Sequence, residues 1–123
     1  MFKVNSLSQK PVYEQLIEQT EKYILTGIIA VGEAMPSVRK LSHEASVNPN
    51  TVGKAYSELI GMGILVSVPG KGCFVAENAV EIIGNSRRAK LCEVKEIFKE
   101  LKLAGIKQEE IISVVAEVYS ENI

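Results

Sequence analysis

Apolar residues recur at steps of three and four in the first part of the chain, the spacing of a helix with one buried face. Between residues 11 and 25 these positions are Tyr13, Leu16, Ile17, Thr20 and Ile24. Pro11 suits the first turn, because the N–H that proline lacks would be unpaired there anyway. Gly27 supplies a left-handed stop beyond the end. The pattern predicts a helix over residues 11–25.

Two shorter amphipathic segments follow, joined by a tight turn. Ser37 is the expected N-cap of the first segment, which ends near residues 46–47 and whose buried positions are Val38, Leu41 and Ala45. Asn48 is the expected cap of the second segment, and Pro49 is its expected first helical residue. The inward positions of this helix are Val52, Ala55, Tyr56, Leu59 and Ile60, and it ends at residues 61–63. The order is that of a helix-turn-helix.

A β-hairpin is predicted directly after this second segment. Ile64, Val66 and Val68 alternate with Leu65 and Ser67, as in a strand that is half-buried on one side. Residues 69–72 form the expected turn and residues 73–75 the returning strand. The fold class is therefore mainly α with a small β-hairpin wing, a winged helix-turn-helix.

The remaining chain is expected to be helical from about Val80. Apolar residues recur at steps of three, four and three at Leu91, Val94, Phe98 and Leu101, the spacing of a coiled-coil seam. Gly105 interrupts the pattern, and a last helix is expected over residues 108–120. The seam is either the core of a monomer or a dimer interface. We favour the dimer, because so short a tail offers little else to cover the seam. The expected division is a winged helix-turn-helix over residues 1–76 and a helical dimerisation tail over residues 77–123.

The distribution of charge adds a modest signal for nucleic acid. The net charge is −1 and the pI is near 5.9, which by itself does not indicate a nucleic-acid-binding protein. Residues 36–90 hold seven basic and four acidic side chains, whereas residues 96–123 hold six Glu and three Lys. A basic centre with an acidic tail fits a DNA-facing surface on one part of the chain.

Several classes of function are disfavoured by composition. The single histidine, His43, argues against a histidine-built zinc site, and Cys73 and Cys92 stand without a partner at metal spacing. Unpaired cysteines without a secretory segment favour a reducing cytoplasm. No apolar run approaches the roughly 18 residues of a membrane span. No nucleophile–base pair, carboxylate dyad or phosphate-binding loop predicts an enzyme, and no cofactor is indicated.

The helix-turn-helix and hairpin together resemble the GntR family of bacterial transcription regulators, over roughly residues 11–76. The resemblance rests on Pro11-x-Tyr13, Gly32, Pro36-Ser37-x-Arg39-x-Leu41, Val47-Asn48-Pro49-Asn50-Thr51-Val52, Ala55-Tyr56-x-x-Leu59 and Gly70-x-Gly72-x-Phe74-Val75. The short tail is similar to the YtrA-type branch, in which this region is a small helical dimerisation unit. The resemblance implies a homodimer that binds a two-fold symmetric, double-stranded DNA operator.

The candidate DNA contacts lie on both helices and on the wing. In a helix-turn-helix the first residues of the second helix reach base edges, which selects Asn50, Thr51 and Lys54. The family pattern adds Arg39, and Ser37 is expected to cap its helix and to offer a phosphate contact. Lys71 and Gly72 fit a groove contact at the wing tip. The alternatives are a solvated helix surface, an ion pair of Arg39 with Glu44, and a plain hairpin turn.

The sequence departs from the family pattern at three positions. Gly53 replaces the usual alanine or larger residue of the recognition helix, and Val66 and Val68 stand where polar and basic wing residues are usual. The wing is therefore expected to add less phosphate affinity, which leaves more of that task to Lys71. The function predicted is a sequence-specific regulator, a repressor by preference; the alternative is a winged-helix adaptor that binds protein. The tail leaves little volume for an effector, although one between the domains stays open.

Overall fold

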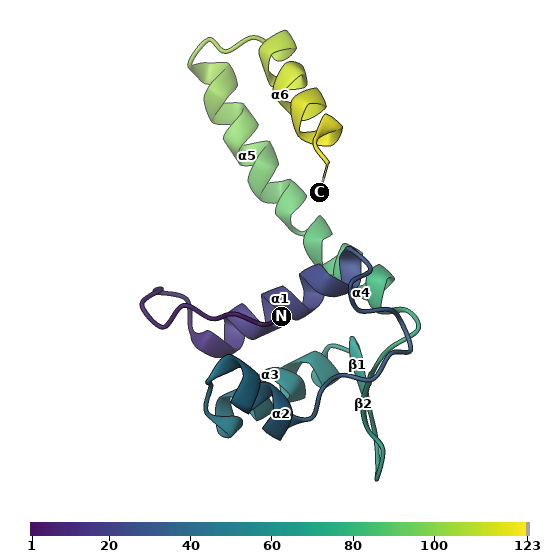
Figure 1. Ribbon diagram of the computed structural model, residues 1–123. Helices are drawn as coiled ribbons and strands as arrows, with labels where there is room; N and C mark the ends of the chain where they lie inside the picture. The colour runs from purple at the N-terminus through teal and green to yellow at the C-terminus, as the bar shows by residue number, and fades with distance from the viewer. Residues whose placement is uncertain (123) are drawn as a thin grey trace. The chain divides into compact units, whose positions relative to one another are not determined.

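The computed structural model describes residues 1–122 and divides the chain into two compact units, Met1–Gly84 and the part from Asn85 on. Unit 1 holds α1 (Val12–Leu25), α2 (Val38–Ala45), α3 (Pro49–Gly61), β1 (Leu65–Val68) and β2 (Gly72–Val75), as Figure 1 shows. It also holds the first part of α4 (Ala79–Arg88). Unit 2 holds α5 (Lys90–Leu103) and α6 (Gln108–Ser120).

The helix starts of the helix-turn-helix follow the predicted capping. The Ser37 hydroxyl accepts a hydrogen bond from the Lys40 N–H at 3.1 Å, and the Asn48 side chain accepts one from the Asn50 N–H at 2.8 Å. Pro49 is the first residue of α3, as predicted. Pro11, however, lies one residue earlier than predicted: it is the N-cap of α1 and not its first helical residue. Its extended ψ of 146° keeps it outside the helix.

The hairpin differs from the prediction in which side of β1 is buried. Leu65 is the buried strand residue and pairs with Val75, while Val66 is 47% exposed. Ile64 is buried but precedes the strand. The segment 64–68 is apolar at four of its five positions, so alternation alone did not determine the buried side. Residues 32–35 lie alongside β2 and form backbone hydrogen bonds with it. The Met35 N–H donates to the Cys73 carbonyl at 2.8 Å.

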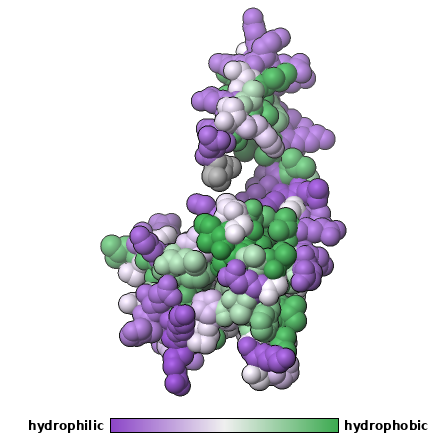
Figure 2. Space-filling view, turned by 45° about the vertical axis from the view of Figure 1, so that its right-hand side comes forward, coloured by the Kyte–Doolittle hydropathy of each residue, from purple (hydrophilic) through white to green (hydrophobic). Residues whose placement is uncertain are grey.

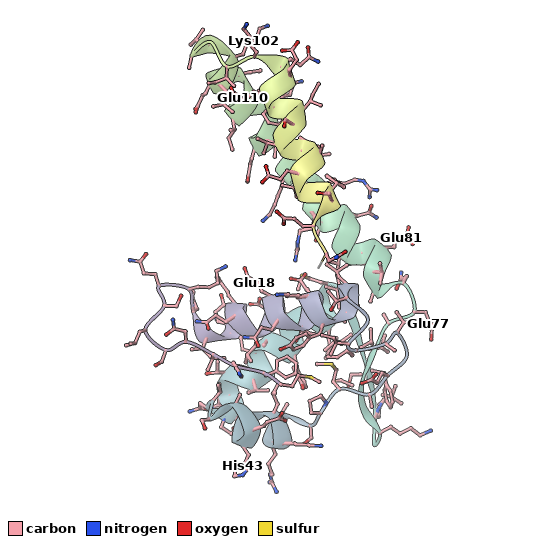
Figure 3. The ribbon with its side chains drawn as sticks, turned by 45° about the horizontal axis from the view of Figure 1, so that its top comes forward. Glu18, His43, Glu77, Glu81, Lys102 and Glu110 are labelled. Atoms are coloured by element: carbon pink, nitrogen blue, oxygen red, sulfur yellow. The ribbon has the colours of Figure 1, made fainter. Side chains whose placement is uncertain are left out.

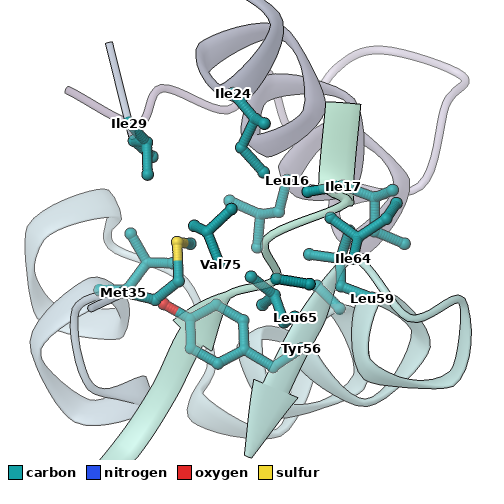
Figure 4. Close-up of a cluster of buried hydrophobic side chains, with 14 of the residues drawn as sticks. Leu16, Ile17, Ile24, Ile29, Met35, Tyr56, Leu59, Ile64, Leu65 and Val75 are labelled. Atoms are coloured by element: carbon teal, nitrogen blue, oxygen red, sulfur yellow. The ribbon is translucent and has the colours of Figure 1, made fainter. Parts of the chain in front are cut away.

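One hydrophobic core fills unit 1. Leu16, Leu41, Val52 and Leu59 are essentially inaccessible to solvent, and the hairpin contributes Leu65 and Val75 to the same cluster (Figure 4). The start of α4 belongs to this core as well, because Ala79 and Ile83 are fully buried. The compact unit therefore extends to Gly84, eight residues beyond the boundary expected from the sequence.

An N-terminal segment that was not predicted lies along α1 and is hydrogen-bonded to it. Phe2 is buried, and its ring meets Tyr23 edge-on with 5.3 Å between the ring centroids. Gln15 accepts from the Asn5 N–H at 2.8 Å and donates to the Asn5 carbonyl at 2.9 Å. Gln19 makes the same pair of bonds to the backbone of Lys3. These side-chain amides pair with the backbone groups of Lys3 and Asn5 as a neighbouring strand would, so those groups are satisfied without a sheet.

Unit 2 is a helical hairpin without a core of its own. No residue of α5 or α6 is buried within the described part of the chain, and only Leu101, Ile106 and Ile111 are even half-buried. Large apolar side chains therefore lie on the surface of this hairpin (Figure 2). A helix pair with so much exposed apolar surface lacks the burial that normally stabilises helices.

Candidate nucleic-acid interface

The start of α2 presents a hydroxyl and a guanidinium to solvent. Ser37 uses one acceptor site for its cap, and within residues 1–122 its hydroxyl proton has no acceptor. Arg39 is exposed and forms no ion pair in the same range. Glu44, the alternative partner considered for Arg39, lies instead 3.4 Å from the Met1 amino nitrogen. The two α2 groups can therefore reach an anion without first breaking an ion pair.

The first two turns of α3 divide cleanly into a buried and a polar side. Val52 and Ala55 are buried, while Asn50 and Lys54 are exposed and Thr51 is half-buried. The Lys54 side chain makes a cation–π contact with α1: its ammonium nitrogen lies 3.8 Å from the centre of the Tyr13 ring. A cation over an aromatic face is attracted by the negative charge of that face. The Lys54 side chain therefore has a defined position before any ligand is bound.

Tyr56 links α3 to the start of α2. It is 4% exposed, and its hydroxyl donates to the Pro36 carbonyl at 2.6 Å. Burial raises the pKa of the Tyr56 phenol well above its ordinary value, and the neighbouring Cys73 and Glu44 raise it further. Tyr56 therefore stays protonated and holds in place the residue next to Ser37. Tyr56 faces inward, as the sequence predicted, and it also fixes the position of the Pro36 carbonyl.

The tip of the wing is a tight turn that carries one cation. The Lys71 N–H donates to the Val68 carbonyl at 2.9 Å, across Pro69 and a Gly70 with φ of +77°. Proline followed by a glycine of positive φ is the signature of a type II turn. Lys71 and Gly72 are exposed at this tip. In Figure 1 the wing tip and the α2–α3 turn lie at the same lower end of unit 1.

Sequence reasoning missed two residues beside the predicted contacts. Ser57 is exposed on α3 one turn after Lys54, and Tyr13 lies beneath the Lys54 ammonium. Ser57 could have been found from helix geometry, because residues three and four apart share a helix face. The pairing of Tyr13 with Lys54 spans two helices, and no local pattern reports it. His43, the single histidine, is exposed and points away from the fold (Figure 3).

In unit 2 a groove of about 410 Å³ runs between α5 and α6. Two of the four predicted seam residues, Phe98 and Leu101, line it, whereas Val94 is 36% and Leu91 is 65% exposed. The α6 side of the groove was missed as a candidate surface and consists of Glu110 and the largely apolar set Ile111, Val114, Val115, Val118 and Tyr119. In the single hairpin the groove exceeds the ~300 Å³ of a small ligand site. The expectation of little free volume concerns a tail whose surface is taken up by dimer contacts, and it stays a prediction.

Other kinds of site find no support in residues 1–122. That range contains no group of three or more metal-ligating side chains. Cys73 is half-buried and Cys92 exposed, and both are free thiols. None of the helices described combines the length and apolar character required to cross a bilayer.

Comparisons with known proteins identify the same region. The model of the bacterial regulatory proteins of the gntR family matches residues 12–75. The HTH-type transcriptional repressor YtrA of Bacillus subtilis (strain 168) is 33% identical over 98% of this chain and 94% of its own. A transcriptional regulator from Oenococcus oeni is similar in structure, with a TM-score of 0.76 and 29% identity over 95% of this chain and 98% of its own. The structure of AraR(DBD) in complex with operator ORX1 is similar over 62% of this chain and 96% of its own, with a TM-score of 0.56 and 31% identity.

Proposed function

This chain belongs to the GntR family of bacterial regulatory proteins and is a DNA-binding transcriptional regulator, not an enzyme, and we propose that it acts as a homodimeric repressor on a two-fold symmetric operator. The DNA contacts proposed are Ser37, Arg39, Asn50, Thr51, Lys54, Lys71 and Gly72. The dimer contacts proposed are Leu91, Val94, Phe98 and Leu101, together with the α6 side of the groove.

The polar side of α3 carries the proposal for DNA recognition. Asn50 is exposed in the first turn, where a helix that enters the major groove meets base edges, and its amide can pair with adenine. Arg39 and the Ser37 hydroxyl flank it with groups suited to phosphate. AraR(DBD), which is similar in structure over 62% of this chain, was solved in complex with operator DNA. An adaptor would present an apolar patch at this surface.

Local charge, and not net charge, accounts for affinity in this proposal. The whole chain carries −1, yet Arg39, Lys40, Lys54 and Lys71 are all exposed on the elements of the interface. Each phosphate that such a cation neutralises releases counterions, so binding weakens as salt rises. The acidic residues of the tail lie on unit 2 and add no charge to these elements.

The exposed apolar groove of unit 2 supports a homodimer. Phe98 is 38% exposed in the single chain, and no α5 or α6 residue within the described range is buried. A second copy of the same hairpin offers the complementary surface, because a two-fold interface pairs one patch with itself. Two linked binding units then engage two half-sites at once, which raises affinity without any new contact.

The repressor assignment rests on relatives: YtrA of Bacillus subtilis and NagR of the same organism are both named repressors. A dimer seated on an operator that overlaps a promoter excludes RNA polymerase without further chemistry. This mode of action requires only tight and selective DNA binding.

Fluorescence anisotropy tests the proposed function. The purified protein is titrated onto a labelled duplex from its own promoter region, at several salt concentrations and against a scrambled competitor. We expect preference for the promoter duplex of about 10³-fold and weaker binding at higher salt. Absence of binding at every salt concentration, to the promoter and to genomic fragment pools alike, would overturn the proposal in favour of the adaptor.

A further inference from the structure

Gly53 lies in the second turn of α3, and no contact or backbone angle of the chain requires a glycine there. A Cβ built at this position meets no protein atom within 4 Å, and the backbone is not in the left-handed region. Glycine in the interior of a helix costs stability relative to alanine, since it loses more backbone freedom on folding. The folded chain therefore bears this cost without any gain in packing or geometry.

Gly63, two residues beyond the end of α3, shows what an internal reason looks like. Its φ is +82°, and a Cβ there would lie 3.3 Å from Ile82 Cδ1. The left-handed conformation alone accounts for a glycine at that position. Neither reason applies to Gly53, so neither the packing nor the backbone conformation of the chain requires a glycine at this position.

Gly53 is surrounded by the polar side of the recognition helix. Asn50, three residues before it, and Ser57, four residues after it, lie on the same helix face and are both exposed. Lys54 follows directly and is held over Tyr13. No side chain within the described residues fills the space above Gly53. The space is therefore open on the side that our proposed function assigns to DNA.

We propose that Gly53 is a DNA-contact residue: the DNA duplex approaches the α3 backbone there so closely that a methyl group has no room. The inference rests on the proposed function. A Cβ extends about 1.5 Å from Cα. Carbon atoms in contact lie at about 3.5–4.0 Å, so an added methyl pushes the helix out of a groove that it otherwise fits.

Two groups of DNA share the apolar C–H chemistry that fits against a bare glycine. One is the C5-methyl of thymine, which projects into the major groove, and the other is a deoxyribose C–H of the backbone. A thymine methyl would make Gly53 a base-reading position. A sugar contact would make it a limit on how deeply α3 enters the groove.

Gly53→Ala tests the inference, with Gly61→Ala as the matched control. Gly61 is the last residue of α3 and, like Gly53, meets nothing within 4 Å and has no positive φ. The probe is a duplex enriched by the wild-type protein from a randomised pool. We expect Gly53→Ala to raise the unfolding midpoint by about 3 °C and to weaken binding at least ~10-fold. Gly61→Ala should leave the affinity within about twofold of wild type.

Replacement of thymine by deoxyuridine in the probe, one position at a time, distinguishes the two DNA groups. Recovery of Gly53→Ala binding on one such duplex supports a thymine methyl, and uniform weakness on all of them supports a sugar contact. Binding of Gly53→Ala as tight as wild type overturns the inference and leaves the proposed function standing. If the wild-type protein enriches no sequence at all, the proposed function fails, and this inference fails with it.

Discussion

The two units of this chain differ in whether they are complete. Unit 1 buries Leu16, Leu41 and Leu59 in a core of its own, and within the described range no buried side-chain polar atom lacks a partner. Unit 2 has two regular helices and no buried residue among those described. Regular helices alone do not make a stable unit, since packing of an apolar face supplies most of their stability. Unit 1 therefore has a core of its own, whereas unit 2 leaves its apolar surface exposed, which in our proposal a second copy covers.

The largest expected effect comes from a charge placed in the groove of unit 2. Phe98→Glu should give a monomer, because a carboxylate buried between two hairpins would lose its hydration. Loss of the paired half-sites should weaken operator binding by roughly 10²–10⁴-fold. Sedimentation and anisotropy measure the two effects.

Leu103→Glu is the control for that variant. Leu103 lies on the same helix, is 92% exposed and does not line the groove. Leu103→Glu should leave both the sedimenting mass of the dimer and its affinity for the operator unchanged. A Phe98→Glu protein that sediments as a dimer would show that the groove is not the interface.

Truncation of an apolar side chain should destabilise the two units differently: only in unit 2 should the loss of stability depend on protein concentration. Leu59→Ala in unit 1 removes a fully buried side chain and should cost about 2–5 kcal/mol at any protein concentration. Val115→Ala in unit 2 should matter only where the dimer forms, so its effect should depend on protein concentration. Urea titrations at two concentrations a hundredfold apart measure this difference; equal behaviour of the two variants would contradict it.

The Tyr56 hydroxyl should give unit 1 a pH dependence that Tyr56→Phe lacks. The folded-state pKa is raised, so the protonated phenol favours the folded state fully below the unfolded value of about 10. That stability is lost as pH rises above this value. Tyr56→Phe should cost about 1 kcal/mol at pH 7, through the bond to Pro36, and less at pH 11. Urea midpoints at the two pH values measure it, and a constant difference would contradict the role of burial.

The smallest effect expected is that of Lys71→Ala at the wing tip. If each protomer contributes one phosphate contact through Lys71, a dimer loses two, and the slope of log K against log salt should fall by about 1.8. Affinity should drop only a few-fold, and equally for specific and scrambled duplexes. The measurement is anisotropy across a salt series. An unchanged slope would mean that Lys71 makes no phosphate contact.

Local rules predicted the parts of the fold that depend on neighbours in sequence. Ser37 and Asn48-Pro49 were predicted to start α2 and α3 because capping acts within a few residues, and both predictions are confirmed. The family and the winged fold were likewise predicted from residues 11–76. The choice of buried side in β1 was wrong, since Val66 and Leu65 are both apolar and only the packing of Leu65 against unit 1 decides between them.

Contacts between distant segments could not be predicted. No local pattern marks Gln15 and Gln19, yet both bind the backbone of the N-terminal segment. Tyr13 was predicted to face the core, but its ring also contacts the Lys54 ammonium. The DNA contacts and the dimer contacts stay predictions, because both involve a partner outside the chain.

Analytical ultracentrifugation of the wild-type protein, alone and with a symmetric operator duplex, tests the central claim most directly. Our account predicts a species of twice the 13.5 kDa chain mass at micromolar concentration and two chains on each duplex. A monomer at every concentration, with one chain on each duplex, would contradict it.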